Sequence, residues 1–274
     1  MISLITATLG RTEPIIQLLD SLVKQTYQNF ELIIVDQNLH DKIGQILSSY
    51  TDKIKIIHIK NKQKGLSLNR NIGLQYACGE IIGFPDDDCY YSEDVLEKVI
   101  ETFNQHPDIS FCATDWRDSI IIGNPARCFD ETPITKRLIY KMCISFNVFI
   151  RNNWNIRFDE RLGVGAAFGA GEETDYLYSL IKVSNKNGWF FNSKGIYHPV
   201  ETSREISKTH NYAIGQGAVW KKDLMERRNI SVLYDILKTS LRYAISALKP
   251  RNIPVVKATL SGFYTGLTKY HAEQ

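Results

Sequence analysis

Three consecutive aspartates, Asp86, Asp87 and Asp88, follow a short apolar run and are the residues best suited to do chemistry. The run, residues 81–84, is expected to be a buried strand. Two like charges about 4 Å apart repel by roughly 4 kcal/mol at an effective dielectric near 20. Solvent can relieve that repulsion in a simple polar turn, and so can Mg²⁺ or Mn²⁺, which prefer hard oxygen ligands. The triplet by itself leaves both interpretations open.

The elements that must position the triplet alternate between strand and helix patterns. Strands are predicted at residues 2–8, 30–35, 54–59, 81–84 and 109–113, and helices at residues 15–23, 43–50, 67–76 and 95–103. The strand at 30–35 is apolar on both faces, which is typical of a central parallel strand covered by helices. The alternation predicts a doubly wound α/β fold with a mainly parallel sheet.

Acidic residues end two of these predicted strands. Asp36 closes the second strand, and the triplet follows the fourth. Ligands of open α/β sheets bind beyond the carboxyl ends of the strands. The convergence of Asp36 with the triplet therefore favours a binding site over a simple turn.

Several other segments carry local predictions. Thr12 is expected to cap the first helix, with Pro14 inside its first turn. Residues 140–150 are apolar and predict a strand that crosses the site. Residues 163–171 contain four glycines and three alanines, which indicates a flexible loop. A helix is predicted at residues 176–183, directly after a group of acidic residues.

The composition is that of a folded protein, with 43% hydrophobic, 23% charged and 11% aromatic residues among 274. The five cysteines form no CxxC pair, which favours free thiols in a reducing cytosol. No secretory signal pattern and no apolar run of about 18 residues is present. We expect a cytoplasmic protein with no nucleic-acid partner.

The charge is uneven along the chain. Residues 221–274 contain ten Lys or Arg and four Asp or Glu, a net charge of +6, although the whole chain carries +3. The tail also has apolar residues at helical spacing, namely Val232, Leu233, Ile236, Leu237, Leu241, Ala244, Ile245 and Leu248. Such a helix could lie on an anionic membrane surface, or pack against the protein body or in a homodimer.

Four stretches, in order, resemble the family 2 glycosyltransferases, which have the GT-A type of nucleotide-diphosphosugar-binding fold. They are Leu4-Ile5-Thr6-Ala7-Thr8 with Arg11, Gln25-Thr26 through Val35-Asp36, Gly65-Leu66-Ser67-Leu68-Asn69-Arg70-Asn71-Ile72-Gly73, and the triplet at the family's DxD position. The resemblance covers roughly residues 1–200. It implies a Rossmann-like α/β fold of GT-A type, here followed by a helical extension.

The resemblance also implies roles in binding the donor. Asp36 would contact the base, Asp87 the sugar or ribose, and Arg70 the phosphates. Thr6, Thr8 and Arg11 belong to the opening strand and turn of the same nucleotide-sugar site. Asp86 and Asp88 would bind the metal and diphosphate, with Asp88 as the first metal ligand, and Mn²⁺ or Mg²⁺ would stabilise the leaving group.

The acceptor side is implied by a second group of residues. Glu173, the second residue of an acidic pair after the glycine-rich loop, matches the family's general base, with Asp175 as the fallback. An acidic first turn is also common in helices for electrostatic reasons alone. His198 lies where many members carry a third metal ligand, although a single histidine is equally often structural. Residues 216–220 are expected to form a helix near the acceptor.

Two departures leave the nucleotide open. Gln37 and Asn38 follow Asp36 where the family usually has acidic or small residues. The first turn has Leu9 and Gly10 in place of an aromatic residue and asparagine. Both segments flank the pocket expected for the base and ribose.

The sequence thus predicts an inverting, metal-dependent glycosyltransferase that uses a nucleotide-diphosphate sugar, UDP-linked in our hypothesis, and a glycan or lipid-linked glycan acceptor in bacterial surface polysaccharide synthesis. Residues 1–115 would bind the donor, residues 116–220 the acceptor, and residues 221–274 would form a basic amphipathic tail. The tail could hold the protein on the inner face of the membrane.

Three alternatives have distinct signatures. A sugar-1-phosphate nucleotidyltransferase would show a glycine-rich basic loop after the first strand, of which only Gly10 and Arg11 are present. A non-catalytic sugar-binding protein of the same fold would not need Asp86, Asp88 and Glu173. A dinucleotide-dependent oxidoreductase would show GxGxxG after the first strand, and this sequence does not.

Overall fold

The computed structural model describes residues 1–120, 129–200 and 205–271, which fall into two compact units. The first unit comprises Met1–Lys64, Leu68–Arg157 and Tyr176–Val200. The second comprises Gly65–Ser67, Phe158–Asp175 and the C-terminal helices. The functional division at residues 115 and 220 that the sequence suggests stays a prediction.

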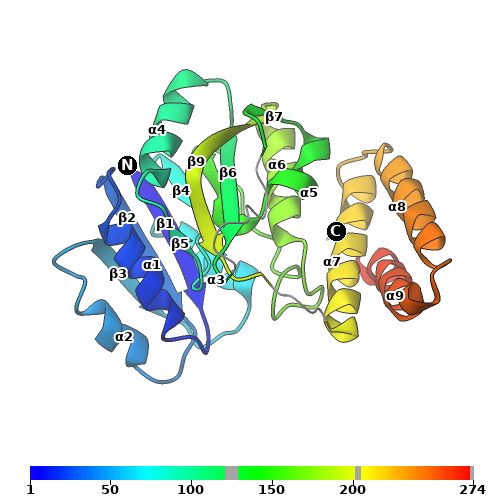
Figure 1. Cartoon of the computed structure of the whole chain (residues 1–274), viewed down its shortest axis with the longest axis horizontal. Helices are drawn as coiled ribbons and strands as arrows, with labels where there is room; N and C mark the ends of the chain where they lie inside the picture. The colour runs from blue at the N-terminus through cyan, green and yellow to red at the C-terminus, as the bar shows by residue number, and fades with distance from the viewer. Residues whose placement is uncertain (121–128, 201–204, 272–274) are drawn as a thin grey trace. The chain divides into compact units, whose positions relative to one another are not determined.

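A single mixed sheet is the core of the first unit (Figure 1). Within the described residues it has nine strands in the order β3-β2-β1-β4-β8-β6-β9-β5, and β7 pairs with β9. The strands are β1 (Ile2–Thr8), β2 (Phe30–Asp36), β3 (Lys55–Lys60), β4 (Ile81–Gly83), β5 (Tyr90–Tyr91), β6 (Phe111–Asp118), β7 (Thr132–Ile134), β8 (Val148–Arg151) and β9 (Gly188–His198). The mainly parallel α/β fold is confirmed.

The strand directions bring several carboxyl ends to one edge. β1 to β4 are parallel, and β8 is antiparallel to both β4 and β6. β6 therefore runs with the first four strands, and β9 runs parallel to β6. The carboxyl ends of these six strands consequently point the same way.

Helices cover both faces of the sheet. They are α1 (Pro14–Val23), α2 (Lys42–Leu47), α3 (Leu66–Leu74), α4 (Val95–Gln105), α5 (Ile139–Met142) and α6 (Glu172–Ser184), with 3₁₀ turns η1 (Lys136–Leu138) and η2 (Ser145–Asn147). Leu4, Leu32 and Ile34 share one apolar cluster with α1, α2 and α4. On the other face α3 approaches so closely that a Cβ on Gly73 would lie 2.3 Å from Ile5 Cγ2. All seven residues of β2 are buried, as a central strand requires.

Two local predictions are wrong. Glu13, not Thr12, precedes the first helical residue Pro14, and no side chain caps this helix. The segment 140–150 is a strand only in its last residues, because Asn147 folds the chain before it into a turn. The side chain of Asn147 accepts from Ile144 N at 2.8 Å and donates to Met142 O at 3.0 Å.

The second unit is built on helices α7 (Ile206–Met225), α8 (Val232–Ser246) and α9 (Ile253–Lys269), with the turn η3 (Pro250–Asn252) before α9 (Figure 1, yellow to red). Helices α7 and α9 pack backbone against backbone. A Cβ on Gly217 would lie 2.4 Å from Phe263 O, and one on Gly266 would lie 2.1 Å from Ile214 O. No described helix is long and apolar enough to cross a membrane.

The glycine-rich segment 163–171 forms no helix and is more tightly held than its composition suggests. Gly163 N donates to Phe168 O at 2.8 Å. Gly171 has φ +91°, and a Cβ on Gly215 of α7 would lie 2.1 Å from Ala170 O. The glycines thus permit a close contact between this loop and α7.

Candidate active site

The carboxyl ends of the parallel strands place polar residues at one edge of the first unit. Thr8 ends β1, Asp36 ends β2 and Lys60 ends β3. The triplet at 86–88 follows β4, and His198 ends β9. The sheet topology therefore brings together residues far apart in the sequence, which is the arrangement expected for a ligand site in this class of fold.

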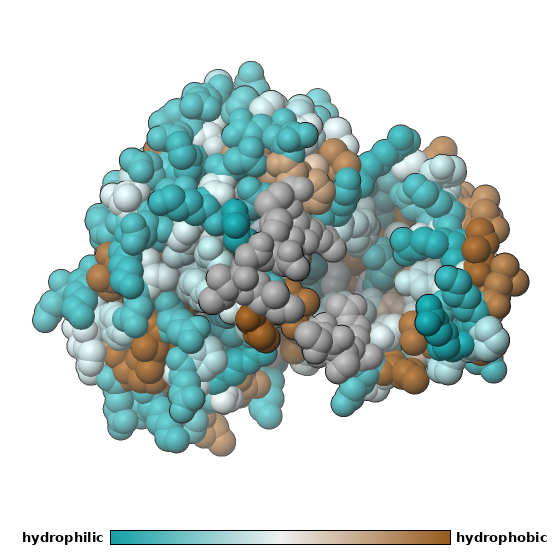
Figure 2. Space-filling view, viewed as in Figure 1, coloured by the Kyte–Doolittle hydropathy of each residue, from teal (hydrophilic) through white to brown (hydrophobic). Residues whose placement is uncertain are grey.

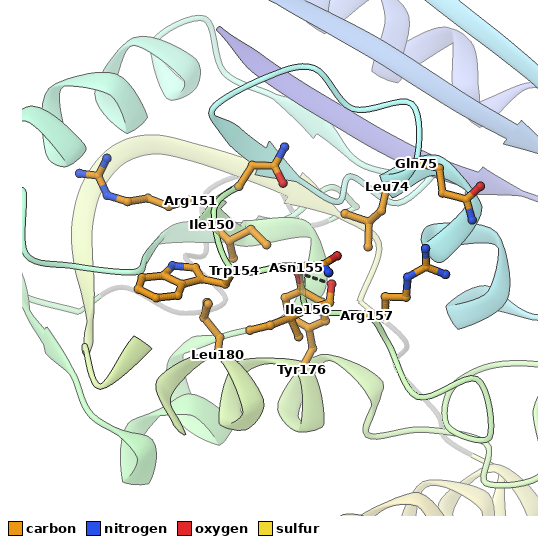
Figure 3. A pocket seen from close by; sticks show the side chains of 11 residues that line it. Leu74, Gln75, Ile150, Arg151, Trp154, Asn155, Ile156, Arg157, Tyr176 and Leu180 are labelled. Carbon is orange, nitrogen blue, oxygen red and sulfur yellow. Dashed lines mark hydrogen bonds between the residues drawn. The ribbon is translucent and has the colours of Figure 1, made fainter. Parts of the chain in front are cut away.

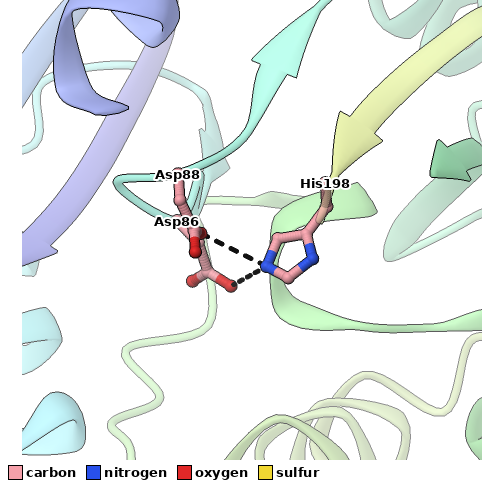
Figure 4. Close-up of side chains that lie close together, drawn as sticks. All are labelled: Asp86, Asp88 and His198. Atoms are coloured by element: carbon pink, nitrogen blue, oxygen red, sulfur yellow. Dashed lines mark ion pairs between the residues drawn. The ribbon is translucent and has the colours of Figure 1, made fainter. Parts of the chain in front are cut away.

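Asp86, Asp88 and His198 form the candidate metal group (Figure 4). His198 Nε2 lies 3.2 Å from Asp88 Oδ1 and 3.9 Å from Asp86 Oδ2. The imidazole stacks on Phe146 with ring centres 4.6 Å apart. Trp116 meets its edge at 6.5 Å. These rings fix the direction in which the imidazole faces the two carboxylates.

The pKa values of Asp88 and His198 are both shifted. Burial raises the pKa of Asp88, but the hydrogen bond and charge of His198 and the charge of Arg11 outweigh it, so the net pKa is lowered. Burial lowers the pKa of His198, but Asp88 and Asp86 reverse this and raise it. Asp88 is therefore held in its anionic form.

Arg11, Arg70 and Thr8 hold the remaining oxygens of the triplet. Arg11 Nη1 donates to Asp87 Oδ1 at 3.0 Å and to Asp88 Oδ2, and Thr8 Oγ1 donates to Asp87 Oδ2 at 2.7 Å. Arg70 is buried, and its Nη2 donates to Asp86 Oδ1 at 2.9 Å and to Ser145 Oγ at 2.9 Å. Burial raises the pKa of Asp87 despite these partners.

Asp36 is fully buried and accepts four hydrogen bonds. Its Oδ1 accepts from the backbone and side-chain nitrogens of Asn38, both at 2.8 Å. Its Oδ2 lies 2.9 Å from Lys60 Nζ and 3.2 Å from His58 Nε2. Burial opposes ionisation here, but Lys60 and Asn38 outweigh it and lower the pKa of Asp36.

Lys60 and His58 are candidate site residues that the sequence interpretation missed, since both contact Asp36. They alternate with isoleucine along β3, whose residues are half-buried or exposed, and this alternation was the available signal. Thr6 lies within β1, and its buried hydroxyl has no hydrogen-bond partner in the described part of the chain. Among the three residues predicted from the opening strand and turn, Thr8 and Arg11 form hydrogen bonds with the triplet and Thr6 does not.

The acidic residues after the glycine-rich loop form the first turn of α6, which begins at Glu172, four residues before the start of the predicted helix. Glu172 is buried, Glu173 is half-buried and Asp175 is 1% exposed. Negative charge at this end also suits the helix dipole. Tyr176, in the next turn of α6, meets the ring of Phe84 edge-on at 5.9 Å, two residues before the triplet.

Asp175 is tied into the second unit by two cations of α7 and the turn after it. Asp175 Oδ2 accepts from Lys222 Nζ at 3.0 Å, and Oδ1 accepts from Arg227 Nη2 at 2.5 Å. Lys222 also donates to Asp159 Oδ2 at 2.8 Å. Tyr270 Oη donates to the same Asp159 oxygen at 2.9 Å. Asp175 is thus an anchored carboxylate, whereas Glu173 is partly open to solvent.

A small cavity of about 150 Å³ lies elsewhere in the first unit (Figure 3). Its lining includes Trp154, Tyr176 and Leu180, and Tyr176 Oη donates to Ile156 O at 3.4 Å. Arg151, also in the lining, pairs with Ile81 at the start of β4, whereas the triplet follows the end of that strand. The cavity is therefore not part of the Asp86, Asp88 and His198 group.

This fold, with acidic residues at the carboxyl ends of its parallel strands, is that of enzymes that bind nucleotide-diphosphosugars. The sequence profile described as glycosyl transferase family 2 matches residues 3–161. The chain belongs to this family. The match favours the glycosyltransferase interpretation over the nucleotidyltransferase and oxidoreductase alternatives.

Relatives and solved structures agree with the family. The minor teichoic acid biosynthesis protein GgaB of Bacillus subtilis is 34% identical over 93% of this chain and 32% of its own length. An uncharacterised glycosyltransferase of Haemophilus influenzae is 32% identical over 47% of this chain and 40% of its own. This chain thus spans well under half the length of these relatives.

Two solved structures share the fold. Residues 1–349 of TarS from S. aureus in complex with UDP-GlcNAc superpose with a TM-score of 0.69 at 20% identity, over 97% of this chain and 81% of that one. The mannosyltransferase PcManGT of Pyrobaculum calidifontis, in complex with GDP-Man and Mn²⁺, gives 0.67 at 11% identity, over 98% and 88%.

Proposed function

We propose that this chain is an inverting, metal-dependent glycosyltransferase that moves one sugar from a nucleotide-diphosphate donor to a hydroxyl group of a glycan or lipid-linked glycan. The observation that carries this proposal is the meeting of Asp86, Asp88 and His198 beyond the carboxyl ends of β4 and β9. A glycosyltransferase of this family must bind the diphosphate of its donor near this edge of the sheet. These three side chains could do so through a bound cation.

The donor set fits a divalent cation. Two carboxylates supply hard oxygens and His198 supplies a nitrogen, a combination that suits Mn²⁺ and is acceptable to Mg²⁺. The cation, when bound, would neutralise the diphosphate and stabilise it as a leaving group. The aromatic rings packed around His198 and the guanidinium of Arg70 on Asp86 would keep the ligands in place before the cation arrives.

Asp36 and Lys60 are proposed to read the base. Uracil and guanine each present an N–H beside a carbonyl oxygen, whereas cytosine and adenine present a bare nitrogen beside an amino group. A carboxylate next to an ammonium group is complementary to the first pattern. The base N–H would replace one of the two donors now on Asp36 Oδ2, and Lys60 would turn to the carbonyl. The pair of Asp36 and Lys60 therefore supports a UDP-linked donor, and a GDP-linked donor is the alternative.

Glu173 is proposed as the general base. It would remove the proton from the acceptor hydroxyl while that oxygen attacks the anomeric carbon and the nucleoside diphosphate leaves. Its partly open position at the first turn of α6 supports this role. Asp175, which is buried and paired with Lys222 and Arg227, is better suited to hold that turn in place than to accept a proton.

The relatives support a setting in surface polysaccharide assembly, since GgaB carries a name from teichoic acid biosynthesis. A cytoplasmic enzyme that works on acceptors at the inner face of the membrane would meet both substrates. This setting is part of the proposal, as are the identity of the donor sugar and of the acceptor.

Donor binding by purified protein tests the proposal. Thermal unfolding is followed with a panel of nucleotide sugars and Mn²⁺, and a true donor at a hundred times its dissociation constant adds about 2.7 kcal/mol of stability. Asp88→Ala and a chelator should each abolish the shift, while Asp52→Ala, an exposed aspartate elsewhere, should keep it. Equal donor binding in Asp88→Ala would overturn the metal site.

The reaction itself separates the remaining alternatives. Slow hydrolysis of the bound donor with metal and no acceptor is expected of a transferase. Release of pyrophosphate from a nucleoside triphosphate and a sugar 1-phosphate would instead indicate a nucleotidyltransferase. Donor binding with neither hydrolysis nor transfer would indicate a sugar-binding protein.

A further inference from the structure

Helix α8 carries an apolar stripe that its own unit leaves uncovered. The stripe consists of Leu233, Tyr234, Leu237, Leu241, Ile245 and, in the turn after the helix, Leu248. These side chains are between 51% and 80% exposed. Apolar atoms gather over this helix at the right edge of the molecular surface (Figure 2). We call these six residues the α8 stripe.

The opposite face of α8 already has its partners. Val232 is buried, and Ile236 and Tyr243 pack in a cluster with Trp220 of α7 and Phe263 of α9. Tyr243 meets the ring of Phe263 at 5.9 Å. The helix therefore does not need the α8 stripe in order to pack in its unit, which leaves the stripe available to another partner.

Positive charge borders the α8 stripe on one side. Lys238, Arg242 and Lys249 each follow a leucine of the stripe directly, at Leu237, Leu241 and Leu248, and all three are exposed. Consecutive helical residues are about 100° apart, so the two on the helix flank the stripe on the same side. Asp235 is the acidic residue of α8. The border therefore has a clear excess of positive charge.

We propose that α8 lies flat on an anionic lipid surface, with the α8 stripe in the boundary between headgroups and acyl chains and the three basic residues on the headgroups. An apolar face with a basic border is the pattern of interfacial helices. Each Lys or Arg near such a surface strengthens the attraction to it. Two copies pairing through the stripe would instead bring their basic borders near each other, with one aspartate per helix to offset them.

Vesicle sedimentation with the full chain tests this proposal. The protein should sediment with vesicles of phosphatidylcholine and phosphatidylglycerol, stay largely in solution with phosphatidylcholine alone, and be released by high salt, because salt screens surface charges. No nucleotide or metal is present, so the result does not depend on the proposed transfer reaction.

Two sets of variants assign the binding to the residues. Replacing Lys238, Arg242 and Lys249 by glutamine should lower partition onto anionic vesicles roughly 100-fold. Replacing Leu237 and Leu241 by glutamine should lower this partition at least about tenfold.

The matched controls are two further variants at positions that are exposed and far from α8 in the sequence. They replace Lys24, Lys42 and Lys62 by glutamine, and Val183 by glutamine. Circular dichroism checks that each variant folds.

Three results would overturn the proposal. The wild-type chain could remain in solution with anionic vesicles. The basic-residue variant could bind them as well as the wild type does. Light scattering could show a dimer that the Leu237 and Leu241 variant splits into monomers, which would assign the α8 stripe to a second copy of the chain.

Discussion

Two groups of paired charges, one in each unit, differ in how far they are open to solvent. In the first unit, the carboxylates of Asp86 and Asp88 and the imidazole of His198 remain partly open to solvent, and Arg11 is half-exposed. In the second unit, Asp159 and Asp175 are nearly inaccessible, and so is their partner Arg227. The charges of the second group have little access to solvent and mainly hold structure, whereas those of the first group are open enough to exchange their partners for a ligand. This difference supports the proposal that the group of Asp86, Asp88 and His198 binds the donor, and it indicates a structural role for the network of Asp159, Asp175 and Arg227.

Glu173→Gln gives the largest expected effect and tests this division. The amide cannot accept the acceptor's proton, so the rate of transfer should fall by about 10²- to 10⁴-fold. Donor affinity, measured by calorimetry with Mn²⁺, should stay within about twofold, since we assign the donor to groups of the first unit. Asp175→Asn is the comparison variant. If it lowered transfer more than Glu173→Gln while the protein stayed equally stable, the assignment of the base would be wrong.

Gly266→Ala is expected to weaken the second unit severely. The added methyl group would meet Ile214 O and Ala218 N, both backbone atoms that cannot move aside. Overpacking of this kind should lower the free energy of unfolding by about 3 kcal/mol or more. Chemical denaturation measures it. Gly169→Ala is the matched control, because its Cβ would meet Asn211 Cβ at an ordinary 3.5 Å, and an equal loss there would refute the packing argument.

Asp159→Asn should give a smaller and pH-dependent loss. Burial opposes its ionisation, but hydrogen bonds from Arg161 and Lys222 outweigh it and hold the pKa of Asp159 well below its usual range. The carboxylate therefore stabilises the fold above about pH 4, the ordinary pKa of aspartate, and this contribution is lost as pH falls toward the folded-state pKa. Denaturation at neutral pH should show a loss of about 2 kcal/mol. A wild-type minus variant difference that did not shrink with acidification would contradict this account.

Lys60→Met has the smallest expected effect. It tests whether Lys60, at the edge of the sheet where the strands end, takes part in recognition of the base. The variant keeps Asp36 but loses the donor proposed for the base carbonyl. The preference for UDP over CDP should fall about tenfold, equivalent to about 1.4 kcal/mol. Competition binding with both nucleotides measures it, and Lys62→Met serves as the neighbouring control. An unchanged preference would separate Lys60 from base recognition, and failure of every nucleotide to bind would count against the donor site itself.

Much of the first unit could be predicted from the sequence, for a physical reason. Buried parallel strands such as Phe30–Asp36 are apolar on both faces, and alternating helices are amphipathic, so their order was readable. The group of Asp86, Asp88 and His198 was predicted because the family resemblance supplied the pairing of distant residues. Spacing alone would not have brought His198 to the triplet, since the placement of β9 beside β6 is decided by the whole sheet.

The errors and omissions share a different cause. Thr12 does not cap the first helix, because the residue before its first helical position is Glu13. Asn147 holds an apolar segment in a turn through three side-chain hydrogen bonds, and the hydrophobic pattern of the sequence does not indicate them. Lys60 and His58 were overlooked because polar residues on an edge strand usually face water. Here they turn toward the buried carboxylate of Asp36. Interactions between distant side chains leave little periodic trace in a sequence.

The glycines where α7 and α9 touch have a consequence for how this protein can change over generations. At Gly217 and Gly266 even one carbon atom would collide with a main-chain atom of the other helix. Single substitutions at these two positions are therefore not expected to be tolerated. A larger residue would fit only if the two helices moved apart, which needs several substitutions at once. In saturation mutagenesis of the second unit, we expect folded variants with most residues at the exposed positions of α8. At Gly217 and Gly266 we expect only glycine to give a folded protein.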